Sequence, residues 1–142
     1  MYRAISFNEL ADLERIALDT AFYPFCQRVM SFVKYRKWYP EDFIENTGLD
    51  VNTYSKLKNG RVKRPDMRTL IAVFVGLRLP LPIVEDLLRS AGMAFTQSKS
   101  DRAYRYVILT MNGATIEECN AFLQEQGVPL LGSIAKDERI TA

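Results

Sequence analysis

The sequence predicts an all-α protein, and three observations lead to this prediction. Apolar residues recur through most of the chain at the i, i+3, i+4 and i+7 spacing of one helix face. Residues that cap helices stand at the starts of these segments, and glycine or proline stands near their ends. No segment alternates apolar and polar residues over the length of a strand, which argues against a sheet.

The first two helices have clear starts. Ser6 and Glu9 form the pattern of a capping box, so a helix is expected over about 7–21. Pro24 suits the first position of a second helix, which is expected to run to about Lys37. Together they form the N-terminal part of the predicted bundle.

Two short helices are expected next, over 40–47 and 51–58. The turn between them begins with Gly48, a residue that tolerates the positive φ such a turn requires. Asp50 can accept hydrogen bonds from the first N–H groups of the second helix. A short helix, a tight turn and a second short helix form the helix-turn-helix arrangement. Four apolar side chains of this pair are expected to face the body of the protein: Phe43, Ile44, Tyr54 and Leu57.

A fifth helix, capped by Asp66, is expected to run to about Leu77, and a sixth covers about 81–91 before Gly92. The fifth helix has the most regular apolar stripe in the chain, which predicts a buried position. This stripe consists of Met67, Leu70, Ile71, Phe74 and Leu77.

The last two helices form an αα-hairpin in this prediction. Ser100 is expected to cap a helix over 101–112. Thr115 and Glu118 form a second capping box, which opens a helix over 116–126.

The absence of histidine excludes several functional classes. Ser-His-Asp and Cys-His catalysis and zinc sites with imidazole ligands all require this residue. Cys26 and Cys119 are too isolated for a metal knuckle, so we expect two buried free thiols. An enzyme would have to use carboxylates such as Glu41, Asp42 and Glu45, which share one exposed helix face. We therefore expect no catalytic site, no metal and no cofactor.

Positive charge is concentrated in the middle of the chain. Residues 26–78 carry a net charge of +6, whereas 1–25 and 79–142 each carry −2. A localised basic segment is the electrostatic footprint of a protein that binds a polyanion, although a solvated basic surface gives the same pattern. No apolar run approaches the roughly 20 residues of a membrane helix, so we expect a cytoplasmic protein without a membrane partner.

The stretch over about 26–88 resembles the DNA-binding domain of the phage repressor/Cro class, also called Xre-type helix-turn-helix regulators. The resemblance rests on Gly48-Leu49-Asp50, on Asn59-Gly60 and on the loop Lys63-Arg64-Pro65. It implies a repressor-like domain of five helices in which the segments 40–47 and 51–58 read DNA.

The resemblance also implies roles for individual residues. Residues on the outer face of the second short helix would contact base edges: Val51, Asn52, Ser55 and Lys56. Residues around that helix would lie near phosphates: Tyr39, Asn59, Arg61, Lys63 and Arg64. The implied function is a sequence-specific regulator of transcription, a repressor that occupies its operator on double-stranded DNA.

Three departures from the family pattern favour a different function. Pro40 lacks the side-chain donor usual at the start of the first short helix, Ile44 replaces a usual Ala, and Tyr54 replaces a smaller aliphatic residue. A protein with this fold could instead be an antitoxin or adaptor that binds a protein partner without base readout.

The prediction divides the chain into a helical extension (1–23), the DNA-binding domain (24–92), a helical hairpin (93–131) and a flexible tail (132–142). The hairpin either adds a layer to the core or forms a homodimer interface. Regulators of this class usually bind as two-fold dimers, with half-sites about 34 Å apart.

Overall fold

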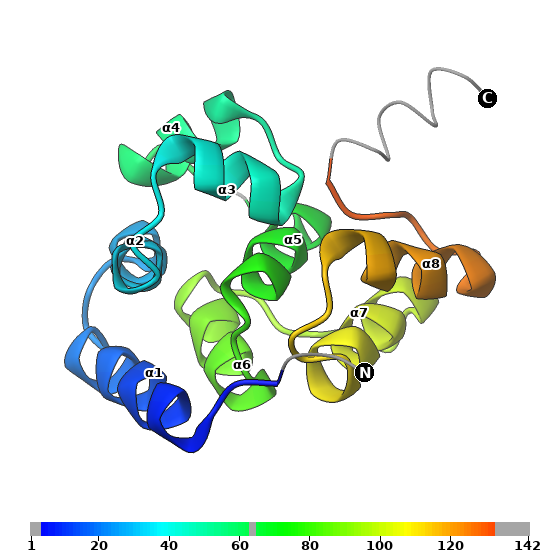
Figure 1. Ribbon diagram of the computed structural model, residues 1–142, viewed down its shortest axis with the longest axis horizontal. Helices are drawn as coiled ribbons and strands as arrows, with labels where there is room; N and C mark the ends of the chain where they lie inside the picture. Colours follow the sequence, from blue (N-terminus) through cyan, green and yellow to red (C-terminus); the bar gives the residue numbers. More distant parts are fainter. Residues whose placement is uncertain (1–3, 63–64, 133–142) are drawn as a thin grey trace.

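The computed structural model describes residues 4–62 and 65–132, and within these ranges it is entirely helical, as the sequence predicts. The described residues form eight α-helices, with α5 near the centre of the bundle (Figure 1). Their bounds are α1 Phe7–Asp19, α2 Phe25–Tyr35, α3 Pro40–Thr47, α4 Val51–Lys58, α5 Met67–Leu77, α6 Leu81–Ser90, α7 Lys99–Thr110 and α8 Ile116–Gln126.

Both predicted capping boxes are formed. The Ser6 hydroxyl accepts a hydrogen bond from the Glu9 N–H at 3.1 Å, and the Glu9 carboxylate accepts from the Ser6 N–H. The same reciprocal pair joins Thr115 and Glu118, at 3.2 Å and 3.0 Å. Hydrogen bonds between residues three apart in the sequence therefore stabilise the first turns of α1 and α8.

The start of α7 differs from the prediction, because Ser98 caps this helix and Ser100 lies within its first turn. The Ser98 hydroxyl accepts from the Asp101 N–H at 3.1 Å. The Asp101 carboxylate in turn accepts the N–H and the hydroxyl of Thr96, both at 2.8 Å. This network satisfies N–H groups of a first turn that begins at Lys99, so the helix starts two residues before the expected position.

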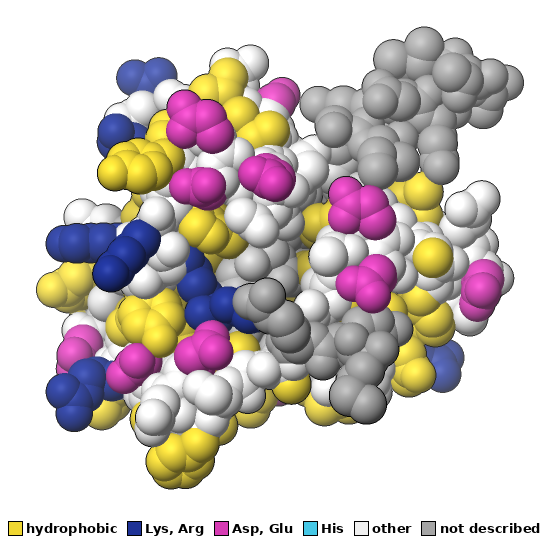
Figure 2. All heavy atoms as spheres, in the orientation of Figure 1, with side chains coloured by type: hydrophobic (Ala, Val, Ile, Leu, Met, Phe, Trp, Pro, Cys, Tyr) yellow, Lys and Arg dark blue, Asp and Glu magenta, His cyan; other side chains and the backbone are white. Residues whose placement is uncertain are grey.

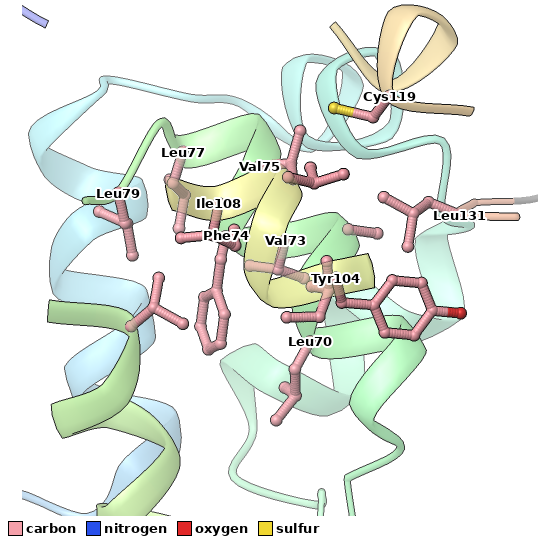
Figure 3. Packing of buried hydrophobic residues seen from close by; sticks show 14 of the residues in the cluster. Leu70, Val73, Phe74, Val75, Leu77, Leu79, Tyr104, Ile108, Cys119 and Leu131 are labelled. Atoms are coloured by element: carbon pink, nitrogen blue, oxygen red, sulfur yellow. The ribbon is translucent and has the colours of Figure 1, made fainter. Parts of the chain in front are cut away.

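The hydrophobic core is built around α5, where seven of eleven residues are buried. Figure 3 shows side chains of α5 meeting those of α7 and α8, among them Tyr104 and Ile108. On its other side α5 packs against α3. One cluster of buried residues extends from Leu13 to Leu131, so the hairpin and the helix-turn-helix share a core. Cys26 and Cys119 are both buried free thiols, as predicted, and burial raises the pKa of Cys119 to about 12.

A buried arginine joins three helices, and no local sequence pattern predicts it. Arg28 of α2 is 1% exposed. Its guanidinium donates to the Asp86 carboxylate of α6 at 2.7 Å and to the Ala17 carbonyl of α1 at 2.9 Å. Weaker bonds of 3.4 Å reach the hydroxyls of Thr20 and Ser90.

Candidate nucleic-acid interface

The turn between α3 and α4 is held by a left-handed glycine and by a buried threonine. Gly48 has φ +70° and donates its N–H to the Ile44 carbonyl at 2.9 Å. Thr47 is fully buried; its hydroxyl donates to the Phe43 carbonyl at 2.6 Å and accepts from the Leu49 N–H at 3.1 Å. These local bonds restrict the angle at which the two helices meet.

The inner side of α4 is anchored to the core. Leu57 is 2% exposed, and the Tyr54 ring meets the Phe43 ring edge-on with centroids 5.2 Å apart. At the N-terminus of the helix, one Asp50 oxygen accepts both the N–H and the hydroxyl of Thr53 at 2.9 Å. The cap and the apolar contacts together fix which side of α4 faces solvent.

The outer side of α4 carries the four residues that the resemblance assigns to base edges: Val51, Asn52, Ser55 and Lys56. All four are exposed, and their i, i+1, i+4, i+5 spacing puts them on one face. The Asn59 amide donates to the Ser55 hydroxyl at 3.3 Å, which extends this polar face by one turn. The structure thus brings the proposed base-contacting residues together on an uncovered helix.

Three of the five residues expected near phosphates are described, and all three are exposed: Tyr39, Asn59 and Arg61. Tyr39 is 72% exposed, and its backbone N–H donates to the Asp42 carboxylate at 2.8 Å. The Arg61 N–H donates to the Lys56 carbonyl at 2.8 Å, which holds the following loop against α4. Lys63 and Arg64 lie outside the described residues.

Some basic residues of the segment 26–78 do not contribute to this surface. Arg28 is buried, and the 9% exposed side chain of Arg36 donates to the Leu77 carbonyl at 3.0 Å and to Glu9 at 2.7 Å. Arg68 donates to the Leu130 carbonyl. Among the described residues, the exposed basic side chains on α4 and just after it are Lys56, Lys58 and Arg61.

Charges of opposite sign lie over different parts of this region. Figure 2 shows Lys and Arg side chains on the left, toward α2 and α4, and acidic side chains over α3. The exposed acidic residues of α3 include Glu41 and Glu45. A polyanion would therefore approach from the side of α4 and not along α3.

The position of Ile44 differs from the one expected for this pair of helices. We expected it to face the body together with Phe43, but its side chain is 39% exposed. The apolar anchor of α3 is Phe43 alone, which is fully buried. More than a third of the surface of Ile44, which replaces the usual Ala, is therefore open to solvent.

A cleft of about 550 Å³ lies between α3, α5 and the start of α8. Glu45, Glu117 and Glu118 line this cleft, with Trp38 and Arg78 also in its wall. Among residues 4–62 and 65–132, no group of His, Cys, Asp and Glu has the arrangement of a metal site. Every helix in these ranges is too short or too polar to cross a membrane.

Sequence reasoning missed a segment that contacts the turn. Residues 128–132 lie partly in the expected hairpin and partly in the expected flexible tail, whose residues beyond 132 are outside the described part. Val128, Leu130 and Leu131 are buried. Three apolar residues so close together after the last helix were the signal that this segment packs on the core.

No family model matches the chain, and searches of the curated proteins and of the solved structures returned no match. Residues and geometry are therefore the basis on which a function can be assigned.

Proposed function

We propose that this protein is a sequence-specific, double-stranded DNA-binding regulator of the phage repressor/Cro class, which represses transcription by occupying its operator. The observation that supports this proposal is the exposed outer face of α4. Asp50 and Leu57 fix the helix, and its solvent side carries small or hydrogen-bonding groups. A helix of this kind fits the major groove of B-DNA, which is about 12 Å wide.

Each side chain on this face has a chemical partner in the groove. The Asn52 amide can pair with N6 and N7 of adenine, and the Lys56 ammonium can donate to O6 or N7 of guanine. The exposed methyl groups of Val51 suit contact with a thymine methyl. Basic groups next to the helix would neutralise phosphates and set its register: Arg61, Lys63 and Arg64.

Selection of bound sites from random duplexes, followed by titrations of variants, tests the proposal. Asn52→Ala should weaken binding to the selected site by about 1–3 kcal/mol and binding to a random duplex much less. Replacing Lys63 and Arg64 by Ala should weaken binding to both duplexes equally and lower the log–log salt slope by about 2. Lys99→Ala, on α7, controls for the loss of an exposed positive charge outside this surface. Equal losses for Asn52→Ala on both duplexes would contradict base readout.

We also propose a second copy of the chain as a partner, bound through α7 and α8. The exposed side of this hairpin has an apolar centre, where Tyr106 stacks on Phe122 with centroids 4.9 Å apart and Leu109 is 54% exposed. Figure 2 shows hydrophobic side chains here, on the right, between acidic groups and a basic group. Under a two-fold axis, the basic edge of one copy would meet the acidic edge of the other. These edges are Arg105 on α7 and Glu125 on α8.

The position of the hairpin alters the expected spacing of half-sites. In Figure 1 the hairpin and α4 lie on opposite sides of the molecule, so such a dimer would hold its two α4 helices at its outer ends. We expect half-sites farther apart than one DNA turn of about 34 Å. Light scattering at micromolar concentration should show a dimer, and Leu109→Glu should yield a monomer. A wild-type protein that stays monomeric on a saturating duplex would contradict the dimer.

One observation favours a second candidate function, an antitoxin or adaptor that binds a protein partner without reading bases. The α3–α4 unit exposes three large apolar side chains: Tyr39 at 72%, Val51 at 53% and Ile44 at 39%. An apolar patch formed by these side chains would be typical of a protein interface. Negligible binding to every duplex at low salt would favour this candidate over the repressor.

A further inference from the structure

Gly127 ends α8, and the five residues beyond it, Val128–Gly132, form a segment that we call the C-terminal strap. In Figure 1 the chain leaves α8 and runs back toward α3 and α5. The strap is anchored by Asn120 of α8, whose amide accepts from the Leu131 N–H at 2.7 Å and donates to the Leu131 carbonyl at 3.0 Å. Leu131 is fully buried and Asn120 is 6% exposed, so both bonds are shielded from water.

Two other elements hold the strap along its length. The Tyr104 hydroxyl of α7 donates to the Pro129 carbonyl at 2.8 Å. Arg68 of α5 donates to the Leu130 carbonyl through its Nε. Three consecutive carbonyl groups of the strap therefore accept hydrogen bonds from three different helices.

The end of the strap lies against the backbone of the helix-turn-helix. A Cβ at Gly132 would lie 3.0 Å from both the Cα and the carbonyl oxygen of Gly48, and 3.1 Å from the Thr47 carbonyl oxygen. A Cβ at Gly76 of α5 would lie 2.7 Å from the Asn46 carbonyl oxygen. The last residues of α3 and the turn thus rest on two glycines, one in α5 and one in the strap.

We propose that the strap sets the position of the α3–α4 turn, and that Asn120 and Gly132 are positioning residues for the exposed face of α4. Burial of Leu130 and Leu131 explains why the strap covers the core. It does not require the backbone of Gly132 to lie against the backbone of Gly48. The turn joins α3 to α4, so a shift of the turn changes the angle between the two helices and the direction of the exposed face of α4. The consequence for DNA rests on the function proposed above, whereas the coupling between strap and turn does not.

Gly132→Ala in the full chain tests the coupling, with Gly92→Ala as the matched control. Both glycines have positive φ, +77° and +73°, so both variants introduce the same kind of backbone strain. A Cβ at Gly92 meets nothing within 4 Å, whereas one at Gly132 meets the turn. In ¹H–¹⁵N spectra, Gly132→Ala should shift the amide signals of residues 43–53, and Gly92→Ala should leave them in place. If Gly132→Ala shifts only signals of the strap and α8, the proposal is wrong.

DNA titration separates this proposal from the proposed function. Gly132→Ala should lower the ratio of affinities for the selected and random duplexes about tenfold, as expected for one misplaced base contact. If the shifts in 43–53 are seen but the wild-type protein binds no duplex, the coupling stands and the DNA-binding function fails.

Native-state hydrogen exchange of the wild-type chain gives a test that needs no variant to fold. The Leu131 N–H is bonded to Asn120, and the Leu49 N–H is bonded to Thr47. If the strap supports the turn, these two amides should exchange through the same opening and respond equally to denaturant. Exchange of Leu131 while Leu49 keeps its full protection would overturn the proposal.

Discussion

Replacing Arg28 by Met tests whether the buried guanidinium holds α1, α2 and α6 together. Methionine fills the space of the arginine stem but removes every donor. The Ala17 carbonyl then loses a 2.9 Å bond and the Asp86 carboxylate a 2.7 Å ion pair. Asp86 is 41% exposed and can be hydrated by water, whereas the acceptors near Ala17 lie deeper.

The expected loss follows from these environments. An acceptor left unsatisfied away from water costs about 1–3 kcal/mol, and the half-exposed carboxylate adds about 1 kcal/mol at most. We therefore expect Arg28→Met to lower the free energy of unfolding by about 3 kcal/mol, or the Tm by about 10 °C. Asp86→Ala should cost about as much, although Asp86 lies at the surface, because it leaves a cation that is 1% exposed without its carboxylate.

Chemical denaturation followed by circular dichroism measures both variants and the double variant. The double variant should be more stable than the sum of the two losses implies, because no charge is then buried without a partner. Lys34→Met, an exposed position on the same helix, should change stability by less than about 0.5 kcal/mol. Strict additivity of Arg28→Met and Asp86→Ala would refute the coupling between the two side chains.

Two further predictions concern the contacts of α3 and α1. Gly76→Ala should destabilise the protein by about 1–2 kcal/mol, because the new Cβ would lie 2.7 Å from a backbone oxygen of Asn46. This loss should exceed the gain from the better helix propensity of Ala. If urea denaturation shows a more stable variant, α3 moves aside freely and the reasoning is wrong. A hydrogen bond from Arg36 holds the pKa of Glu9 below its ordinary 4.5, so the unfolded chain takes up the proton more readily. The stability that Glu9 contributes is then complete above pH 4.5 and is lost as the pH falls through its lower folded pKa. Glu9→Gln should therefore lower the free energy of unfolding at pH 7 and make it fall less steeply in acid. Parallel pH profiles of the variant and the wild type would contradict this.

Features encoded by neighbouring residues could be predicted from the sequence. The helices 40–47 and 51–58 have the predicted bounds, since Gly48 and Asp50 act within one turn of the chain. The same holds for the capping box at Thr115. The placement of Val51 and Lys56 on the exposed side of α4 follows from helical spacing once Leu57 is recognised as core.

Features that depend on distant partners could not be predicted in this way. Arg28 enters the sequence analysis only in the net charge of residues 26–78, because its partner Asp86 lies 58 residues away. Ile44 has the same apolar character as Phe43, and only the packing of α3 on α5 decides which of them is buried. Gly132 has no local signal that it meets Gly48, because that contact requires the complete bundle.

The central position of α5 also matters when the chain is not folded. From Leu70 to Leu77 the sequence has no charged residue and no proline, and Ile71, Val73 and Val75 favour extended backbone as much as helix. A segment of this composition readily joins others in cross-β aggregates once it is exposed. Two arginines flank it, Arg68 and Arg78, and like charges at the ends of such a segment keep separate chains apart. The helix on which the native core depends is thus also the part of the chain that must be covered soonest during synthesis.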